Sequence, residues 1–170
     1  HFKLLFSQAY RSPGIENIDL NAGLNPPEYE PDIMAEKTNV VEFETGRRLT
    51  KTMFLSANLF YIKIKDPIVY YFDEQGNEGY DNMEQTGSYG FEVQYQWKTN
   101  NGYLAANYSH YLTNENLNKT NDYIVHNDKS ALLGSPKHKL NVYGSYNFTK
   151  KLSINPSVTY LSSRYAYTDY

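Results

Sequence analysis

A repeated alternation of apolar and polar side chains constrains this chain more than any other feature. In the stretch Gly87–Leu112, apolar Tyr89, Phe91 and Val93 alternate with polar residues, the chain turns over at Thr99–Gly102, and the alternation resumes. Residues two apart lie on the same face of a β-strand, so this run predicts two strands that each have one apolar face. Either a second layer of protein or the lipid of a membrane must cover that face.

About seven segments show this alternation, and each is about nine to thirteen residues long. They are Phe2–Tyr10, Thr38–Gly46, Met53–Lys65, Ser88–Lys98, Leu104–Leu112, Lys137–Phe148 and Leu152–Tyr160. Strands of soluble proteins average roughly five to six residues, whereas tilted membrane strands need roughly nine to eleven to cross the hydrocarbon. The length of the segments therefore favours a membrane.

The connections between these segments alternate between short and long. The short ones are rich in Asn, Gly, Thr and Lys, and they are Arg47–Thr52, Thr99–Gly102 and Thr149–Lys151. The long ones are Arg11–Lys37, Asp66–Thr86 and Thr113–Pro136, and such lengths are uncommon in compact soluble domains. Outer-membrane barrels have short periplasmic turns and long extracellular loops, which is the order found here.

Composition excludes several classes of protein. The formal net charge is −3, so no basic surface suggests a nucleic-acid partner, and the absence of cysteine excludes disulfides and a thiol nucleophile. Mean hydropathy is −0.69, and no run approaches the roughly 20 apolar residues of a membrane helix. The 18 tyrosines, 8 phenylalanines and one tryptophan suit either the aromatic girdles of a membrane barrel or an exposed binding sheet.

The polar faces of the expected strands carry charges that a dry protein core would not tolerate. Glu42, Glu44, Glu92 and Lys139 are examples, and all of them suit a wide, wet lumen. We therefore predict an all-β, antiparallel transmembrane β-barrel. An odd number of strands, and a first residue that already lies within a strand, indicate a fragment of a larger barrel whose N-terminal part is missing.

The motifs AYRSP, MAEKTNVVEFETG, ANLFYIKIKDPIVY, TGSYGFEVQYQW, LAANYSHY and SPKHKLNVYGSY follow one another along the chain. In this order they resemble the C-terminal barrel region of TonB-dependent outer-membrane receptors. AYRSP (Ala9–Pro13) is similar to the family's Phe-Arg-Ala-Pro-like strand end, although Ser12 replaces the alanine. MAEKTNVVEFETG (Met34–Gly46) is similar to the next loop end and descending strand, although Ala35 stands where proline is usual. The resemblance extends over all six motifs and so covers nearly the whole chain.

The resemblance implies an importer in the outer membrane of a Gram-negative bacterium, with a barrel of roughly 22 strands closed by an N-terminal plug. Its expected partners are outer-membrane lipid, the plug of the same protein and, through the plug, TonB. The expected ligand is a bulky, scarce nutrient such as a metal chelate, and a ferric siderophore in particular. The residues between Ser12 and Asp32 contain no histidine, and this argues against haem as the ligand. These 170 residues include no plug and no TonB box.

Candidate ligand-binding residues lie in the long loops. They are Arg11, Glu28, Tyr29, Tyr80, His126 and Asp128. For Arg11 a structural ion pair is favoured over ligand contact, because rim arginines usually orient loops. His126 and Asp128 are too few for a metal site, and the carboxylates around Tyr29 lack the spacing of a calcium loop. We expect no cofactor, no metal site and no catalytic residue, since no enzyme motif rises above chance.

Two alternatives remain open at the level of the sequence. A passive porin-like barrel would share the strands but would have no plug. A soluble, tyrosine-rich β-sheet module that binds carbohydrate or acts as an adhesin would fold in plain buffer without detergent. A membrane sheet would aggregate there, because nothing would cover its apolar face.

Overall fold

The computed structural model describes residues 1–18, 33–72, 78–119, 125 and 127–166. In these ranges the regular structure consists of one helical turn at 15–18 and ten strands. The strands are β1 (Phe2–Arg11), β2 (Glu36–Arg48), β3 (Met53–Lys65), β4 (Ile68–Phe72), β5 (Glu78–Asn82), β6 (Gln85–Lys98), β7 (Gly102–Leu112), β8 (His138–Thr149), β9 (Leu152–Ile154) and β10 (Ser157–Leu161). No helix in the described ranges is long and apolar enough to span a membrane.

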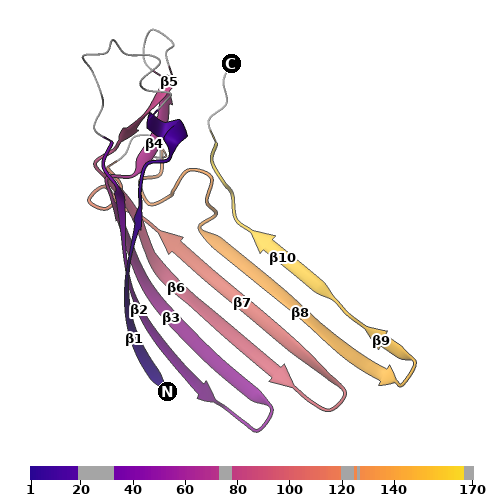
Figure 1. Ribbon diagram of the computed structural model, residues 1–170. Coiled ribbons are helices and arrows are strands. Elements are labelled where there is room, and N and C mark those ends of the chain that lie inside the picture. Colours follow the sequence, from indigo (N-terminus) through magenta and orange to yellow (C-terminus); the bar gives the residue numbers. More distant parts are fainter. Residues whose placement is uncertain (19–32, 73–77, 120–124, 126, 167–170) are drawn as a thin grey trace, which may run out of the picture.

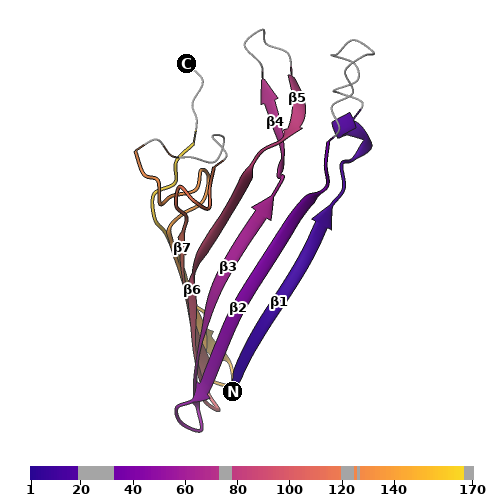
Figure 2. The same ribbon diagram turned by 90° about the vertical axis from the view of Figure 1, so that its left-hand side faces the viewer.

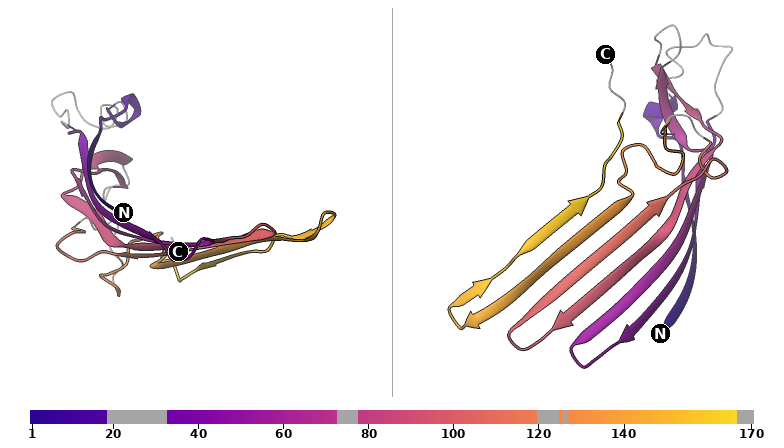
Figure 3. Two further views of the ribbon diagram at one scale, coloured as in Figure 1. Left: turned by 90° about the horizontal axis from the view of Figure 1, so that it is seen from below. Right: turned by 180° about the vertical axis from the view of Figure 1, so that it is seen from behind.

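Eight of the strands form one antiparallel sheet, in the order β1-β2-β3-β6-β7-β8-β10, with β9 paired to β8 beside β10. The sheet is a single curved layer of long, tilted strands, and its two edges do not meet (Figures 1 and 3). The short turns gather at one end, whereas the small β4–β5 sheet and the longer connections gather at the other (Figure 2). The predicted all-β, antiparallel architecture is confirmed.

The register of the strands places apolar residues opposite apolar residues throughout most of the sheet. Leu59 of β3 lies opposite Phe43 of β2 and Phe91 of β6, and the apolar positions of the other strands line up in the same way. Large apolar side chains therefore share one face, including Phe2, Leu4, Phe6, Val41, Phe43, Leu55, Leu59, Val93, Tyr95, Trp97, Leu104, Leu140, Val142, Val158 and Tyr160. The other face carries most of the carboxylates and amides.

In β2 and β3 the two faces differ in exposure as well as in chemistry. On the apolar face Leu59 is 55% exposed, whereas Phe60, which points to the polar face, is only 8% exposed. Side chains crowd together on the inner side of a curved sheet, which indicates that the polar face is the concave one. In the described residues no second layer of protein covers the apolar face, so the sheet has no core of its own (Figure 3).

Two local features differ from the expected strands. The segment Leu152–Tyr160, expected as one strand, is divided into β9 and β10 at Asn155 and Pro156. Proline has no N–H to donate to the ladder, and the carbonyl of Pro156 instead accepts a hydrogen bond from the Gly144 amide at 3.0 Å. The connection between Lys65 and Gln85 contains its own hairpin, β4–β5, whose turn at 73–77 lies outside the described residues.

Candidate functional site: the loop-bearing rim and the polar face

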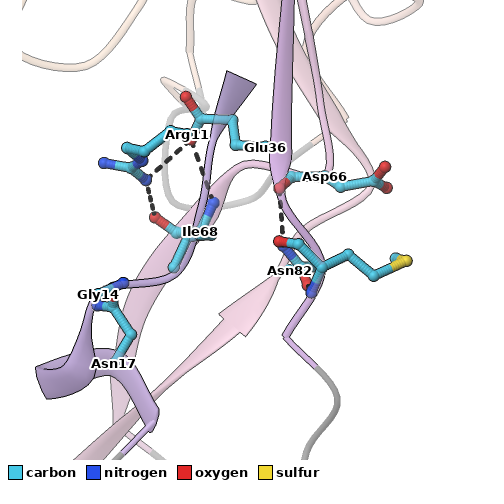
Figure 4. Close-up of polar contacts among 8 residues, drawn as sticks. Arg11, Gly14, Asn17, Glu36, Asp66, Ile68 and Asn82 are labelled. Atoms are coloured by element: carbon cyan, nitrogen blue, oxygen red, sulfur yellow. Dashed lines mark hydrogen bonds and ion pairs between the residues drawn. The ribbon is translucent and has the colours of Figure 1, made fainter.

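Arg11 lies at the junction of two strands and a loop. It ends β1, directly opposite Glu36 at the start of β2, and its Nη2 lies 2.8 Å from Glu36 Oε2. The same Nη2 donates a hydrogen bond of 2.9 Å to the carbonyl of Ile68, and the Ile68 amide donates to Glu36 Oε2 at 3.3 Å (Figure 4). The pair therefore holds the beginning of β4 against the ends of β1 and β2.

Asn82, the last residue of β5, holds the other end of the same hairpin. Its Nδ2 donates to the carbonyls of Asp66 at 2.7 Å and Met34 at 3.0 Å, and its Oδ1 accepts from the Met34 amide at 2.6 Å (Figure 4). Asp66 has a φ of 52°, a left-handed conformation that turns the chain from β3 into the hairpin. The hairpin is thus fixed at both ends to the rim, by which we mean the end of the sheet that carries the long connections.

The β4–β5 hairpin presents two tyrosines as a cross-strand pair. Tyr70 lies opposite Tyr80, and their ring centroids are 5.3 Å apart in an edge-on arrangement. The Tyr70 hydroxyl donates a hydrogen bond to Glu78. This hydrogen bond, with a smaller contribution from burial, raises the pKa of Tyr70 to about 12, so the phenol stays neutral at physiological pH. An edge-on tyrosine pair offers apolar ring surface at the end of the sheet that carries the long connections.

The connection between β7 and β8 is fastened along the edge of β6. Thr113, only 1% exposed, donates through its hydroxyl to the Gly87 carbonyl at 2.8 Å. Beyond it, the Thr86 hydroxyl donates to Asn118 Oδ1 at 2.8 Å, and the Lys119 amide donates to the Gln85 carbonyl at 3.0 Å. The few buried apolar side chains of this connection are Leu117, Val125 and Ala131. Its described part is therefore a packed structure on the rim.

Asp128 closes this second loop onto the start of β8. Its Oδ2 lies 2.6 Å from the Lys137 ammonium, and its Oδ1 accepts a hydrogen bond of 2.7 Å from the Ser130 hydroxyl. The hydrogen bond from Lys137, followed by the one from Ser130, lowers the pKa of the Asp128 carboxyl below its ordinary value. Through these two contacts the Asp128 carboxylate holds the loop against the start of β8.

The polar face carries a row of charged and amide side chains at one level across six strands. In register these are Lys3, Glu44, Asn58, Glu92, Ser109 and Lys139. Asn58 Nδ2 donates to Glu42 at 2.9 Å, while Glu92 accepts from the hydroxyls of Tyr111 at 2.6 Å and Ser109 at 3.2 Å. A hollow in this face is lined by Glu44, Asn58, Glu92, Gln94 and Asn107 among others. In this row the two lysines balance the two glutamates in charge.

The structure joins some of the predicted site residues and separates others. Arg11 contacts the hairpin that carries Tyr80, whereas Asp128 belongs to the other loop. Glu28, Tyr29 and His126 lie outside the described residues. Within the described ranges, no group of three or more possible metal ligands gathers.

Sequence reasoning missed Glu36, Tyr70, Asn82 and Lys137 as parts of this rim. Glu36 is 25 residues from Arg11 in sequence, and only the β1–β2 register shows that they are opposite one another. A signal did exist for Tyr70, because Gly76-Asn77 predicts a turn that would place the flanking segments side by side.

Comparison with protein families decides what this sheet belongs to. The family model described as TonB dependent receptor-like, beta-barrel matches residues 2–170. The chain belongs to this family. A comparison with curated proteins found no match. Membership confirms both the resemblance read from the six motifs and the transmembrane barrel, of which this open sheet is a part. TonB-dependent receptors are transporters of the Gram-negative outer membrane and not enzymes, and they generally work with a plug domain and TonB.

Family membership assigns the two faces of the sheet. In a transmembrane barrel the outer wall is apolar and the lumen wall polar, so Leu59 faces lipid and Asn58 faces the lumen. In barrels of this kind the short turns generally lie at the periplasm and the long loops outside the cell. From Met53 to Tyr61 the apolar side of β3 extends about 26 Å along the strand. At a tilt of roughly 40° this is roughly 20 Å of height, close to the roughly 25 Å apolar band of such barrels.

Proposed function

We propose that this chain is part of the barrel of a TonB-coupled importer of a bulky, scarce nutrient, with a ferric siderophore as the expected cargo. In this proposal residues 1–170 supply about seven strands of a roughly 22-stranded barrel, and the plug is elsewhere in the protein. The long loops 11–37, 66–86 and 113–136 are extracellular and capture the ligand. The lumen wall then conducts the ligand when the plug moves.

The observation that supports ligand capture is the fixed hairpin that carries Tyr70 and Tyr80. A binding loop gains affinity when its conformation is set before the ligand arrives, because less ordering entropy is lost on binding. The hairpin is fixed at both ends, by Arg11 and Glu36 at one and by Asn82 at the other. Its tyrosine pair offers apolar ring surface to a bulky chelate.

Within this proposal the candidate residues have different roles. Tyr80, with Tyr70, contacts the ligand directly. Arg11 and Asp128 position their loops, since each is engaged with a neighbour: Arg11 with Glu36, and Asp128 with Lys137. Glu28, Tyr29 and His126 are proposed as contacts in the parts of the loops that lie outside the described residues.

The experiment that tests this function is radioactive iron uptake by cells that express the full-length receptor. Ferric catecholate and ferric hydroxamate chelates serve as probes, each in a strain with TonB and in one without it. We expect saturable uptake of one chelate class only when TonB is present. Equal uptake without TonB would support the porin-like alternative, and uptake of neither chelate would remove the siderophore assignment.

A variant pair tests the role of the tyrosines. Tyr80→Ala removes the ring and the hydroxyl, while Tyr80→Phe removes only the hydroxyl. Contacts between aromatic rings contribute about 0.5–1.5 kcal/mol of binding free energy beyond the effect of their buried area. We therefore expect the alanine variant to bind the transported chelate roughly tenfold more weakly. The phenylalanine variant should lose less affinity. Immunoblots of the outer membrane control for receptor amount, and unchanged affinity in Tyr80→Ala would exclude this contact.

A further inference from the structure

The outer wall changes character at the extracellular end of β1, β2 and β3. Two successive outward rows are apolar, namely Leu4, Phe43 and Leu59 and then Phe6, Val41 and Tyr61, and the members of each row lie opposite one another in the sheet. The next outward row is polar, and it consists of Gln8, Asn39 and Lys63. The row after that consists of Tyr10, Lys37 and Lys65. Three lysines therefore lie on the lipid-facing side, directly above the apolar band.

These lysines form an arrangement that is unfavourable by itself. Lys37 and Lys65 are directly opposite in the β2–β3 ladder, and like charges at such positions destabilise a sheet. Among the described residues, no carboxylate lies within ion-pair distance of Lys37, Lys63 or Lys65. Four other lysines of the chain do have such partners, namely Lys3, Lys119, Lys129 and Lys137. An external anion would remove the repulsion.

Neighbouring side chains hold this patch in place. The Tyr10 hydroxyl donates to Gln8 Oε1 at 2.5 Å, and Gln8 Nε2 donates to Asn39 Oδ1 at 2.6 Å. The Lys37 ammonium lies 5.5 Å from the centre of the Tyr10 ring, within range of a cation–π interaction. Glu36 cannot neutralise Lys37, because it points to the other face and is paired with Arg11. The cationic groups therefore stay available on the outer side.

We propose that Lys37, Lys63 and Lys65 bind the phosphate groups of phosphorylated glycolipid in the outer leaflet of the outer membrane. Lys63 and Lys65 are two and four residues beyond Tyr61, which corresponds to roughly 7 and 13 Å along the strand. At a tilt of roughly 40° they lie roughly 5 and 10 Å above the apolar band, at the depth of lipid headgroups. Flexible lysine side chains reach the interface readily, and juxtamembrane cations attract anionic headgroups.

The test uses the full-length receptor in lipid nanodiscs and fluorescent lipid A as the probe, in its phosphorylated and dephosphorylated forms. The variant is the triple substitution Lys37→Gln, Lys63→Gln and Lys65→Gln. The matched control is Lys51→Gln, Lys150→Gln and Lys151→Gln, which makes the same change in charge at the turns of the opposite end. Each interfacial lysine contributes about fivefold in affinity, so we expect the first triple variant to bind phosphorylated lipid A at least tenfold more weakly. The control variant should bind like the wild type.

Three outcomes would overturn the proposal. The first is equal affinity of the wild type for phosphorylated and dephosphorylated lipid A. The second is an equal loss of affinity in the two triple variants, which would indicate a general effect of charge. The third is equal stabilisation of the wild type by inorganic phosphate alone in nanodiscs without phosphorylated glycolipid, which would indicate a free-anion site. Iron uptake is not a readout here, so the result is independent of the proposed cargo.

Discussion

At the scale of single residues, Arg11 joins three segments that are far apart in sequence. Removing its guanidinium in Arg11→Ala leaves Glu36 without its cation and the Ile68 carbonyl without this donor. The side chain is 59% exposed, so the ion pair contributes less than about 1 kcal/mol and the hydrogen bond about as much. We expect the β4 amides to exchange with deuterium roughly threefold to tenfold faster, as measured by mass spectrometry on the purified full-length receptor.

The matched variant for this prediction is Arg11→Lys. Lysine keeps the positive charge near Glu36 but has no planar fork to reach Glu36 and the Ile68 carbonyl together. Its exchange rates should therefore fall between those of the wild type and Arg11→Ala. If both variants exchange at the wild-type rate, Arg11 does not hold the hairpin.

Asp128 gives the second loop a defined dependence on pH. Hydrogen bonds from Lys137 and Ser130 lower its pKa in the folded state below the ordinary value of 3.8. A lowered folded pKa means that the contact contributes its full stability above about pH 4 and loses it as the pH falls through the folded value. We expect a spin label at Leu133→Cys to keep its restricted mobility from pH 7 to pH 5 and to gain mobility only below about pH 4.

The control for this prediction is Asp128→Asn, which removes the titrating group and keeps a similar shape. The label should then be more mobile already at pH 7, and its mobility should change less on acidification. A mobility increase in the wild type between pH 7 and pH 5 would assign the transition to another group.

At the scale of elements, the two faces of β6 provide a direct test of sidedness. Val93 lies between Ala57 and Tyr108 on the apolar face, whereas its neighbour Gln94 lies between Ser56 and Asn107 on the polar face. A lysine facing lipid near the bilayer midplane costs roughly 2–4 kcal/mol, and one facing a wet lumen costs little. We expect Val93→Lys to reduce the folded fraction in the outer membrane strongly and Gln94→Lys to leave it nearly unchanged.

Heat-modifiable migration in gel electrophoresis measures that folded fraction, because folded barrels run differently from unfolded chains. The two variants differ by one position and carry the same new charge, so each is the control for the other. Equal yields from both would contradict the assignment of the faces.

The elements that the sequence predicts well are those with a strict period of two. Alternation located the strands that became β1, β2, β3, β6, β7 and β8, because each must match one apolar and one polar environment. It did not divide Leu152–Tyr160 at Pro156, since the apolar positions continue on both sides of the proline. It also did not show the partners of Arg11 or the opposed Lys37 and Lys65, because these depend on the register between strands.

At the scale of the whole molecule, the sheet presents features that only a larger assembly can satisfy. β1 and β10 are edges with a partner on one side only, and each exposes unpaired backbone groups. The six motifs were enough to predict the family, because they occur in the family's order along nearly the whole chain, while the alternation of the strands predicted the barrel. The ligand could not be predicted in the same way, since its proposed contacts lie in loops where no periodic pattern limits the residues.

The open edges and the uncovered face lead to a prediction about residues 1–170 expressed on their own. Phe2, Leu4 and Phe6 are 77%, 75% and 69% exposed on the edge strand, next to backbone groups without partners. An edge of this kind recruits further strands, and an apolar face of this extent associates in water. We therefore expect these residues to aggregate in plain buffer and to remain dispersed only in detergent, as measured by size-exclusion chromatography with light scattering. A folded, detergent-free monomer would contradict the membrane assignment of the apolar face, because water would then cover what lipid is expected to cover.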